Sequence, residues 1–262
     1  MPVTGPFGVV LAGKAGYEGI QLGDLGGISA GFPMNRKSVQ EGYLQAAADA
    51  GVTLQAIHPY GLQRQGTMLT TRNMPGWEDA RRSLAMCVDA CVDMNVPELM
   101  VSSFFNTMIN NDRELRVYAE HLNYACDLGE DKGVVISYES ALTLSQIFLM
   151  MELTRGRMKV CYDVRNPIEL GSGQPAEDIL ALGADHIAHI HIKDFPEDMK
   201  NWCLIGDGIS QIDAIAKVIE STGYTGWFIS ENDYGFLASQ ADCDFLIPAA
   251  EDARRMRKLF CL

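Results

Sequence analysis

The sequence predicts a single α/β domain, residues 1–262, built as a (β/α)8 barrel of the TIM type. An amphipathic helical stretch, a small-residue turn and a short apolar run recur in this order along the chain, and most of the runs end in a polar residue. Apolar strands that each follow a helix are typical of a parallel sheet covered by helices. An open doubly wound sheet is disfavoured because no GxGxxG motif follows the first strand. The chain has 262 residues, and barrels of about 250 residues form one domain.

The repeating unit defines the expected elements in order. The first copy is a helix over Val9–Gly16 followed by a strand over Tyr17–Leu22. Six further strands are expected at Val52–His58, Glu98–Ser103, Gly133–Glu139, Met158–Asp163, His186–Ile192 and Gly226–Glu231. The helices expected before them, with one that closes the chain, are Ala46–Gly51, Arg81–Met94, Leu115–Leu128, Gln146–Leu153, Ala176–Leu182, Ile212–Ser221 and Phe245–Leu259.

The first strand of a complete barrel is expected to be missing or truncated. Only Met1–Gly5 precedes Pro6, which is too short for both a strand and a loop. Unpaired strand edges are a template for another chain. Either the edges close on each other, a second subunit fills the gap, or this chain is a shortened version of a longer one, and we expect a homo-oligomer.

Composition and charge exclude several classes of protein. The chain carries 21 Lys and Arg against 34 Asp and Glu, a formal charge of −13, so a nucleic-acid partner is not expected. No apolar run reaches the roughly 20 residues that cross a bilayer, and no signal peptide is recognisable. Seven cysteines without a CxxC motif are typical of reduced thiols in the cytoplasm. Cys87 and Cys91 share a helix face and are expected to be buried.

Four polar residues end apolar runs and predict a metal site. They are Glu139, Asp163, His191 and Glu231. In a parallel barrel the carboxyl ends of the strands share one face, where active sites lie. Three carboxylates and one imidazole suit Mn²⁺, and also Mg²⁺, Co²⁺ or Zn²⁺.

Five further residues are expected around this site. His189 lies two residues before His191 on the same strand, so it points to the same side but one layer deeper, where it either orients the site or fills the interior. Lys193 follows at the rim and is a candidate for holding a substrate oxygen. His58, Asn166 and Trp202 complete the expected substrate-binding set.

Six short motifs, in this order, resemble the xylose isomerase-like sugar phosphate isomerase/epimerase family. They are Ala15–Ile20, Tyr138–Glu139, Cys161–Asp163, His189–Asp194, Gly206–Ile209 and Ile229–Glu231. The resemblance implies a metal-dependent barrel whose four ligands fall on Glu139, Asp163, His191 and Glu231. It also implies that the two glutamates act as acid and base on opposite sides of a sugar.

The chain departs from the pattern of the family's ketose epimerases at the substrate positions. Asn166 stands where these enzymes have a histidine, Gln21 ends a strand that often ends in glutamate, and the substrate arginine after the HxH strand is missing. These changes leave the identity of the substrate open more than the binding of a metal ion. Some relatives in the superfamily cleave DNA with a zinc cluster that needs many histidines. This chain has five histidines, so DNA cleavage is not expected.

Three functions remain open at this point. The leading one is an isomerase or epimerase of a ketose or related small polyhydroxy carbonyl compound, acting through an enediolate. The second is a lyase of the inosose or dehydroshikimate dehydratase kind. The third is a non-catalytic sugar-binding barrel subunit. The turn around Asp207 lies where barrels often hold the phosphate of a substrate. The negative charge of Asp207 would repel a phosphate dianion, whereas Arg165 and Lys193 would attract it. Unphosphorylated substrates are therefore slightly preferred.

Overall fold

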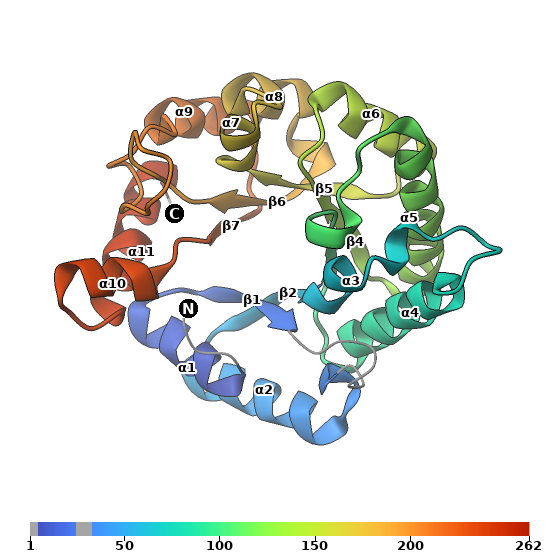
Figure 1. Cartoon of the computed structure of the whole chain (residues 1–262). Helices are drawn as coiled ribbons and strands as arrows, with labels where there is room; N and C mark the ends of the chain where they lie inside the picture. Colours follow the sequence, from blue (N-terminus) through green and yellow to red (C-terminus); the bar gives the residue numbers. More distant parts are fainter. Residues whose placement is uncertain (1–4, 25–32, 262) are drawn as a thin grey trace. The chain divides into compact units, whose positions relative to one another are not determined.

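Helices and parallel strands alternate along the chain in the computed structural model, which describes residues 5–24 and 33–261 (Figure 1). The strands are β1 Gly19–Asp24, β2 Thr53–Pro59, β3 Glu98–Ser102, β4 Val135–Glu139, β5 Lys159–Asp163, β6 Ile187–Ile192 and β7 Trp227–Ser230. The α-helices are α1 Pro6–Ala15, α2 Lys37–Ala50, α3 Tyr60–Gln65, α4 Trp77–Asp93, α5 Asp112–Lys132, α6 Leu144–Leu153, α7 Asn166–Leu170, α8 Pro175–Leu182, α9 Ile212–Thr222, α10 Tyr234–Ala241 and α11 Leu246–Phe260. The 3-10 helices are η2 Pro33–Asn35, η3 Thr67–Leu69, η4 Phe105–Thr107 and η5 Ala184–His186.

The strands of the described residues form one seven-stranded sheet in the order β1-β2-β3-β4-β5-β6-β7. The strand pairs β2–β3, β3–β4, β4–β5 and β6–β7 are parallel, with Leu99 opposite Ile136 and Ile190 opposite Phe228. This order and direction confirm the predicted α/β class, and each predicted strand is present. Parallel neighbours in sequence order require a crossover helix between them, which is why the helix–strand repeat predicted them so well.

The first strand begins two residues later than its predicted start at Tyr17. Gly16 takes the left-handed conformation with φ 91°, and the Tyr17 N–H donates to Ala12 O, so Tyr17 still belongs to the cap of α1. Before β1 the described residues contain α1 and no strand, so the segment Val9–Ala12 is helical as predicted. The first four residues, part of the short stretch discussed for a first strand, lie outside the described residues.

The described residues group into two compact units. One unit comprises residues 5–20, 45–53 and 161–261. In it, Ala15 of α1, Tyr234 of α10 and Ala249 of α11 form a buried cluster. The register of β6 on β7 places His191 opposite Ile229 and Ile192 opposite Ser230.

The other unit comprises residues 21–24, 33–44 and 54–160. Its core lies between β3 and the helices α4 and α5, where Leu84, Leu99 and Leu122 are fully buried. Cys87 and Cys91 are buried on α4, as predicted. Ser102 at the end of β3 is opposite Glu139 at the end of β4.

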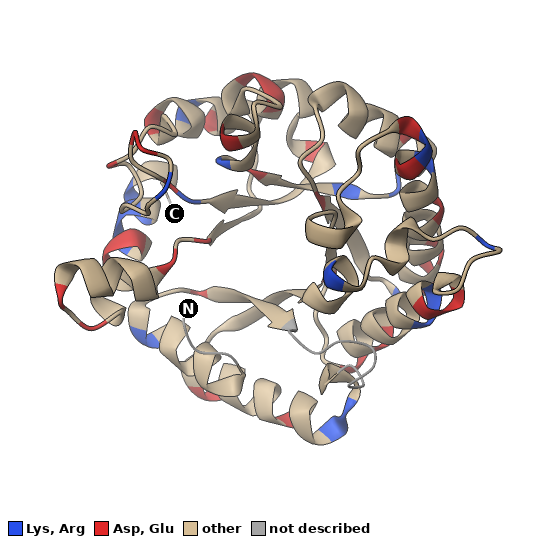
Figure 2. Cartoon of the chain, viewed as in Figure 1, with Lys and Arg blue, Asp and Glu red and all other residues tan. Residues whose placement is uncertain are grey.

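Charged residues lie mainly on the helices and loops, while most of the strand surface carries none (Figure 2). This distribution is expected for strands that are buried on both faces. Among the described residues, no helix is both long and apolar enough to cross a bilayer.

Candidate metal centre

Three predicted metal ligands end consecutive strands of one unit. Asp163 is the last residue of β5, His191 lies one residue before the end of β6, and Glu231 directly follows β7. The backbone binds these ends together, because Val164 N–H donates to His191 O at 3.2 Å and Glu231 N–H donates to Ile192 O at 3.0 Å. The parallel register therefore brings the three side chains to one edge of the sheet.

The side-chain atoms of the three residues converge. His191 Nδ1 lies 3.5 Å from Glu231 Oε2 and 3.9 Å from Asp163 Oδ2. Lys193 Nζ lies between the two acids, 2.7 Å from Asp163 Oδ2 and 2.5 Å from Glu231 Oε2. Asp163 and His191 are buried, whereas the Glu231 side chain is 32% exposed, so solvent reaches the centre from the Glu231 side.

Local backbone structure orients Asp163. Its Oδ1 accepts hydrogen bonds from the N–H groups of Arg165 at 2.7 Å and Asn166 at 2.8 Å, at the start of the short helix α7. Aspartate commonly caps the N–H groups that a helix start leaves over. With Oδ1 held in this way, Oδ2 points to His191 and Lys193.

The charge of Glu231 is set by opposing effects. Burial alone would raise the pKa of this carboxyl, but the neighbouring Lys193 ammonium and His191 hold it well below its ordinary value. Glu231 is therefore ionised at neutral pH and acts as a hydrogen-bond acceptor.

The donor set fits a divalent cation. The ligand atoms of Asp163, His191 and Glu231 all lie within 4.8 Å of one another. Ligands at about 2.1 Å from an ion, separated by 90–110°, lie roughly 3.0–3.4 Å apart, so small side-chain movements would close the set on an ion. The Lys193 ammonium already satisfies both carboxylates as a cation would. Two carboxylates and an imidazole suit Mn²⁺, Mg²⁺, Co²⁺ or Zn²⁺.

The other unit gathers polar residues at the ends of β2, β3 and β4. His58 Nε2 lies 2.8 Å from Ser102 Oγ, and Ser102 Oγ donates to Gln63 Oε1 at 3.0 Å. The His58 ring packs on Tyr60 with ring centroids 4.3 Å apart. Glu139, the remaining predicted ligand, is buried at the end of β4, opposite Ser102. Ser102 and Gln63 were not expected from the sequence, in which a lone Ser or Gln carries no signal.

The remaining predicted residues take varied places. His189 is fully buried below His191, with its Nε2 3.2 Å from the Nε2 of His191. Trp202 covers the guanidinium of Arg165 at 4.5 Å from the ring centroid, and Phe195 flanks the same guanidinium at 4.6 Å. Asn166 is the first residue of α7. Lys193 pairs with two of the predicted metal ligands, a contact that its assignment to substrate did not anticipate.

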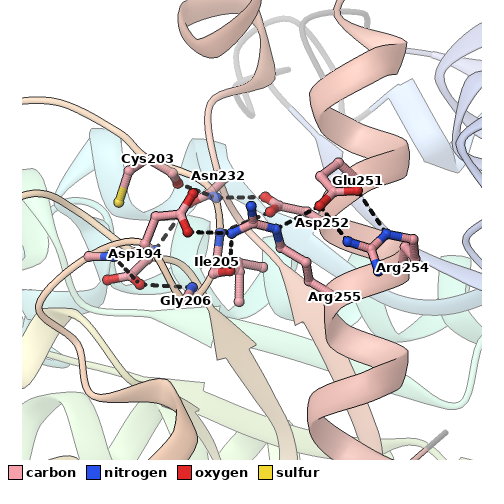
Figure 3. Close-up of polar contacts among 11 residues, drawn as sticks. Asp194, Cys203, Ile205, Gly206, Asn232, Glu251, Asp252, Arg254 and Arg255 are labelled. Carbon is pink, nitrogen blue, oxygen red and sulfur yellow. Dashed lines mark hydrogen bonds and ion pairs between the residues drawn. The ribbon is translucent and has the colours of Figure 1, made fainter.

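A buried polar network that the sequence did not predict surrounds Asp194 (Figure 3). Asp194 is 0% exposed and accepts from four backbone N–H groups. Its Oδ1 accepts from Phe195 at 2.9 Å and Ser210 at 3.1 Å, and its Oδ2 accepts from Gly206 and Gly208, both at 3.0 Å. One carboxylate thus holds the loop between β6 and α9.

Asn232 connects this loop to α11. Its Oδ1 accepts from Asp194 N–H at 3.2 Å, and its Nδ2 donates to Cys203 O at 2.9 Å and to Asp252 Oδ2 at 2.7 Å. Asp252 also accepts from Ile205 N–H at 2.9 Å. Burial raises the pKa of Asp252 to about 6, although its hydrogen bonds oppose the shift. Asn232 directly follows Glu231, and Asp194 directly follows Lys193. The network therefore fixes the backbone next to these two residues of the centre.

Comparison with known proteins identifies the family. A profile of the family described as xylose isomerase-like TIM barrel matches residues 9–258, almost the whole chain. The chain belongs to this family. The TIM-type barrel fold predicted from the sequence is therefore confirmed, as is the family resemblance of its motifs.

Two kinds of enzyme appear among the relatives of this family member. A 2-epi-5-epi-valiolone 7-phosphate 2-epimerase of Actinoplanes sp. is 29% identical, with 97% of this chain and 93% of the relative covered. An inosose dehydratase of Clostridium beijerinckii is 26% identical, but 46% of this chain and 48% of the relative are covered.

Solved structures agree on the fold. D-psicose 3-epimerase of Clostridium cellulolyticum H10 superimposes with a TM-score of 0.76 at 12% identity, covering 97% of this chain and 93% of the other. The IOLI protein, solved with a zinc atom bound, gives a TM-score of 0.76 at 14% identity over 98% of this chain and 93% of the other.

Proposed function

We propose that the chain is a divalent-metal-dependent epimerase or isomerase of a ketose or related small polyhydroxy carbonyl compound. The observation that carries this proposal is the convergence of Asp163 Oδ2, His191 Nδ1 and Glu231 Oε2 at the carboxyl ends of three strands. In TIM-type barrels the active site lies at these ends. Mn²⁺ is the proposed ion, because carboxylate-rich sites favour hard divalent cations.

Glu139 is proposed as the fourth ligand. Glu139 is the last residue of β4, as Asp163 is the last residue of β5, and the motif Tyr138–Glu139 is one of those that resemble the family. Both facts support a role for Glu139 in the same centre.

The two glutamates are proposed to move the proton. A bound divalent ion would polarise a carbonyl and its neighbouring hydroxyl, which acidifies the C–H between them. Glu231 is partly exposed at the centre, so it is placed to remove that proton as a general base once Lys193 no longer pairs with it. Glu139 would return a proton from the opposite side, which inverts the carbon or moves the carbonyl.

Substrate contacts are proposed for the residues around the centre. Lys193 would exchange its carboxylate partners for a substrate oxygen once an ion neutralises those acids. Trp202 and His58 offer ring surfaces with polar edges, as sugar sites require. Asn166 would supply an amide, and His189 would support His191 from below.

Epimerisation is favoured over dehydration by the extent of the similarity. The epimerase from Actinoplanes matches along nearly the whole chain, whereas the inosose dehydratase matches along about half. The names of both relatives refer to polyhydroxylated ring ketones, so such compounds belong in any substrate panel next to open-chain ketoses.

Solvent deuterium exchange tests the proposal. The protein loaded with Mn²⁺ is incubated in D2O with a panel of ketoses and ring ketones, free and phosphorylated, and NMR follows loss of the C–H signal beside the carbonyl. We expect exchange and an epimeric or isomeric product with at least one compound. Loss of water would assign a lyase, and absence of exchange with every compound would refute an enzyme of this class.

Two variants test the assigned roles. Glu231→Gln and Glu139→Gln keep the side-chain shape but remove the base, so we expect exchange to fall by at least about 10²-fold. Glu152→Gln, on the exposed side of α6, is the matched control and should exchange at the unaltered rate. Unchanged exchange in either active-site variant would refute its role as acid or base.

A further inference from the structure

A second group of metal-ligating side chains lies one layer below the candidate centre. Cys161 and Asp163 are two residues apart on β5, and His189 and His191 are two residues apart on β6, so each pair points to one side of its strand. Asp163 belongs to the upper layer, Cys161 and His189 belong to the lower layer, and His191 belongs to both. All three members of the lower group, Cys161, His189 and His191, are buried.

The separations in this lower group match a small tetrahedral site. His189 Nε2 and His191 Nε2 are 3.2 Å apart, and two nitrogen ligands on one zinc-like ion are separated by about 3.3 Å. Cys161 Sγ lies within 4.8 Å of both imidazoles. A sulfur and a nitrogen on the same ion are about 3.6 Å apart, so Cys161 needs to move by at most about 1.2 Å.

The two layers differ in the ion that they prefer. The upper layer offers carboxylate oxygens to a hard cation, whereas the lower layer offers one thiolate and imidazole nitrogen. Thiolates select zinc, cadmium or monovalent copper over manganese and magnesium. The lower layer therefore discriminates against the ion proposed for catalysis.

His191 belongs to both layers, and this couples them. Its Nδ1 faces Glu231 and Asp163, while its Nε2 faces His189. A neutral imidazole has one nitrogen with a free lone pair, and the other carries the proton. When Nδ1 binds an ion, Nε2–H can donate to His189; when Nε2 binds an ion, Nδ1–H can donate to Glu231. One imidazole thus serves one ion at a time.

We propose that Cys161, His189 and His191 form a binding site for a thiophilic metal ion, and that its occupation displaces the ion of the upper centre. This site goes beyond the proposed function, with which it shares His191. Zinc or cadmium at this place would inhibit the protein by removing one ligand from the upper centre.

Competition between Mn²⁺ and Cd²⁺ tests the proposal on the full chain. Electron paramagnetic resonance reports free Mn²⁺, and near-ultraviolet absorption reports thiolate-to-cadmium charge transfer. We expect stoichiometric Cd²⁺ to release Mn²⁺ from the unaltered protein while the charge-transfer band rises. In Cys161→Ser, release should need at least about tenfold more Cd²⁺, and part of the band should be lost.

A second cysteine variant and an acid variant complete the test. Cys203→Ser removes a partly buried thiol outside the group and should release Mn²⁺ like the unaltered protein. Glu231→Gln should keep the Cys161-dependent band even where Mn²⁺ no longer binds, so failure of the upper centre is distinguishable from failure of the lower one. Equal release by Cd²⁺ from Cys161→Ser and the unaltered protein, or a band that does not depend on Cys161, would overturn the proposal. Circular dichroism confirms that each variant is folded.

Discussion

Asp194→Asn is expected to destabilise the protein severely, although it only replaces one carboxylate oxygen with an NH2 group. The carboxylate accepts four backbone N–H groups, two on each oxygen. An asparagine keeps one oxygen, so two of these N–H groups would face an NH2 group that cannot accept. Asp194 is fully buried, so water does not replace the lost acceptor.

The magnitude follows from the number of lost bonds. Hydrogen bonds to charged groups contribute about 1.5–3 kcal/mol each, so loss of two costs roughly 3–6 kcal/mol. Domains are stable by about 5–15 kcal/mol, so the variant would lose a large part of its stability. The loop residues Gly206, Gly208 and Ser210 should also lose protection, because their N–H groups are the donors.

Urea unfolding at pH 7 and amide hydrogen exchange measure both effects. Asp131→Asn, at an exposed position of α5, is the matched control and should change the free energy of unfolding by less than about 0.5 kcal/mol. A loss below about 1 kcal/mol in Asp194→Asn, with an unchanged denaturant slope, would show that this carboxylate does not hold the loop.

Two further predictions concern the same network. The pKa of Asp252 is raised from 3.8 to about 6, so the folded protein binds its proton more tightly than the unfolded chain. The contribution of this group to the free energy of unfolding should therefore fall by about 3 kcal/mol as pH rises from about 4 to 6. The difference in the free energy of urea unfolding between the unaltered protein and Asp252→Asn should show the same pH dependence. A difference independent of pH would contradict the prediction. In Gly208→Ala the new Cβ would lie 2.2 Å from Asp194 Oδ1 and 2.4 Å from Phe195 O, so we expect a loss of about 1–3 kcal/mol, whereas Gly23→Ala, with nearest atoms at 3.7 Å, should be tolerated on the thermal unfolding curve.

The helix–strand alternation could be read from the sequence because it depends on local chemistry. Leu99, Met100 and Val101 form a continuous apolar run in β3 because both faces of this parallel strand are buried, and glycines such as Gly133 mark the helix ends with positive φ. The position of Asp163 at a strand end followed from the same pattern. The start of β1 did not, because the cap of α1 at Gly16 depends on a hydrogen bond that sequence periodicity does not show.

The residues of the centre were predictable as a class, but not their contacts. Strand-end polarity predicted Asp163, His191 and Glu231, and only the register of β5, β6 and β7 decided that Lys193 pairs with both acids.

The pairings of Asn232 with Asp252 and of His58 with Ser102 join residues 20 and 44 positions apart. No periodicity connects such positions, and each of these residues alone is compatible with an exposed loop. The sequence by itself therefore determined the order of helices and strands and the kinds of residue at the strand ends. The tertiary structure decided which of those side chains touch, because packing and strand register, rather than local propensity, set the distances between them.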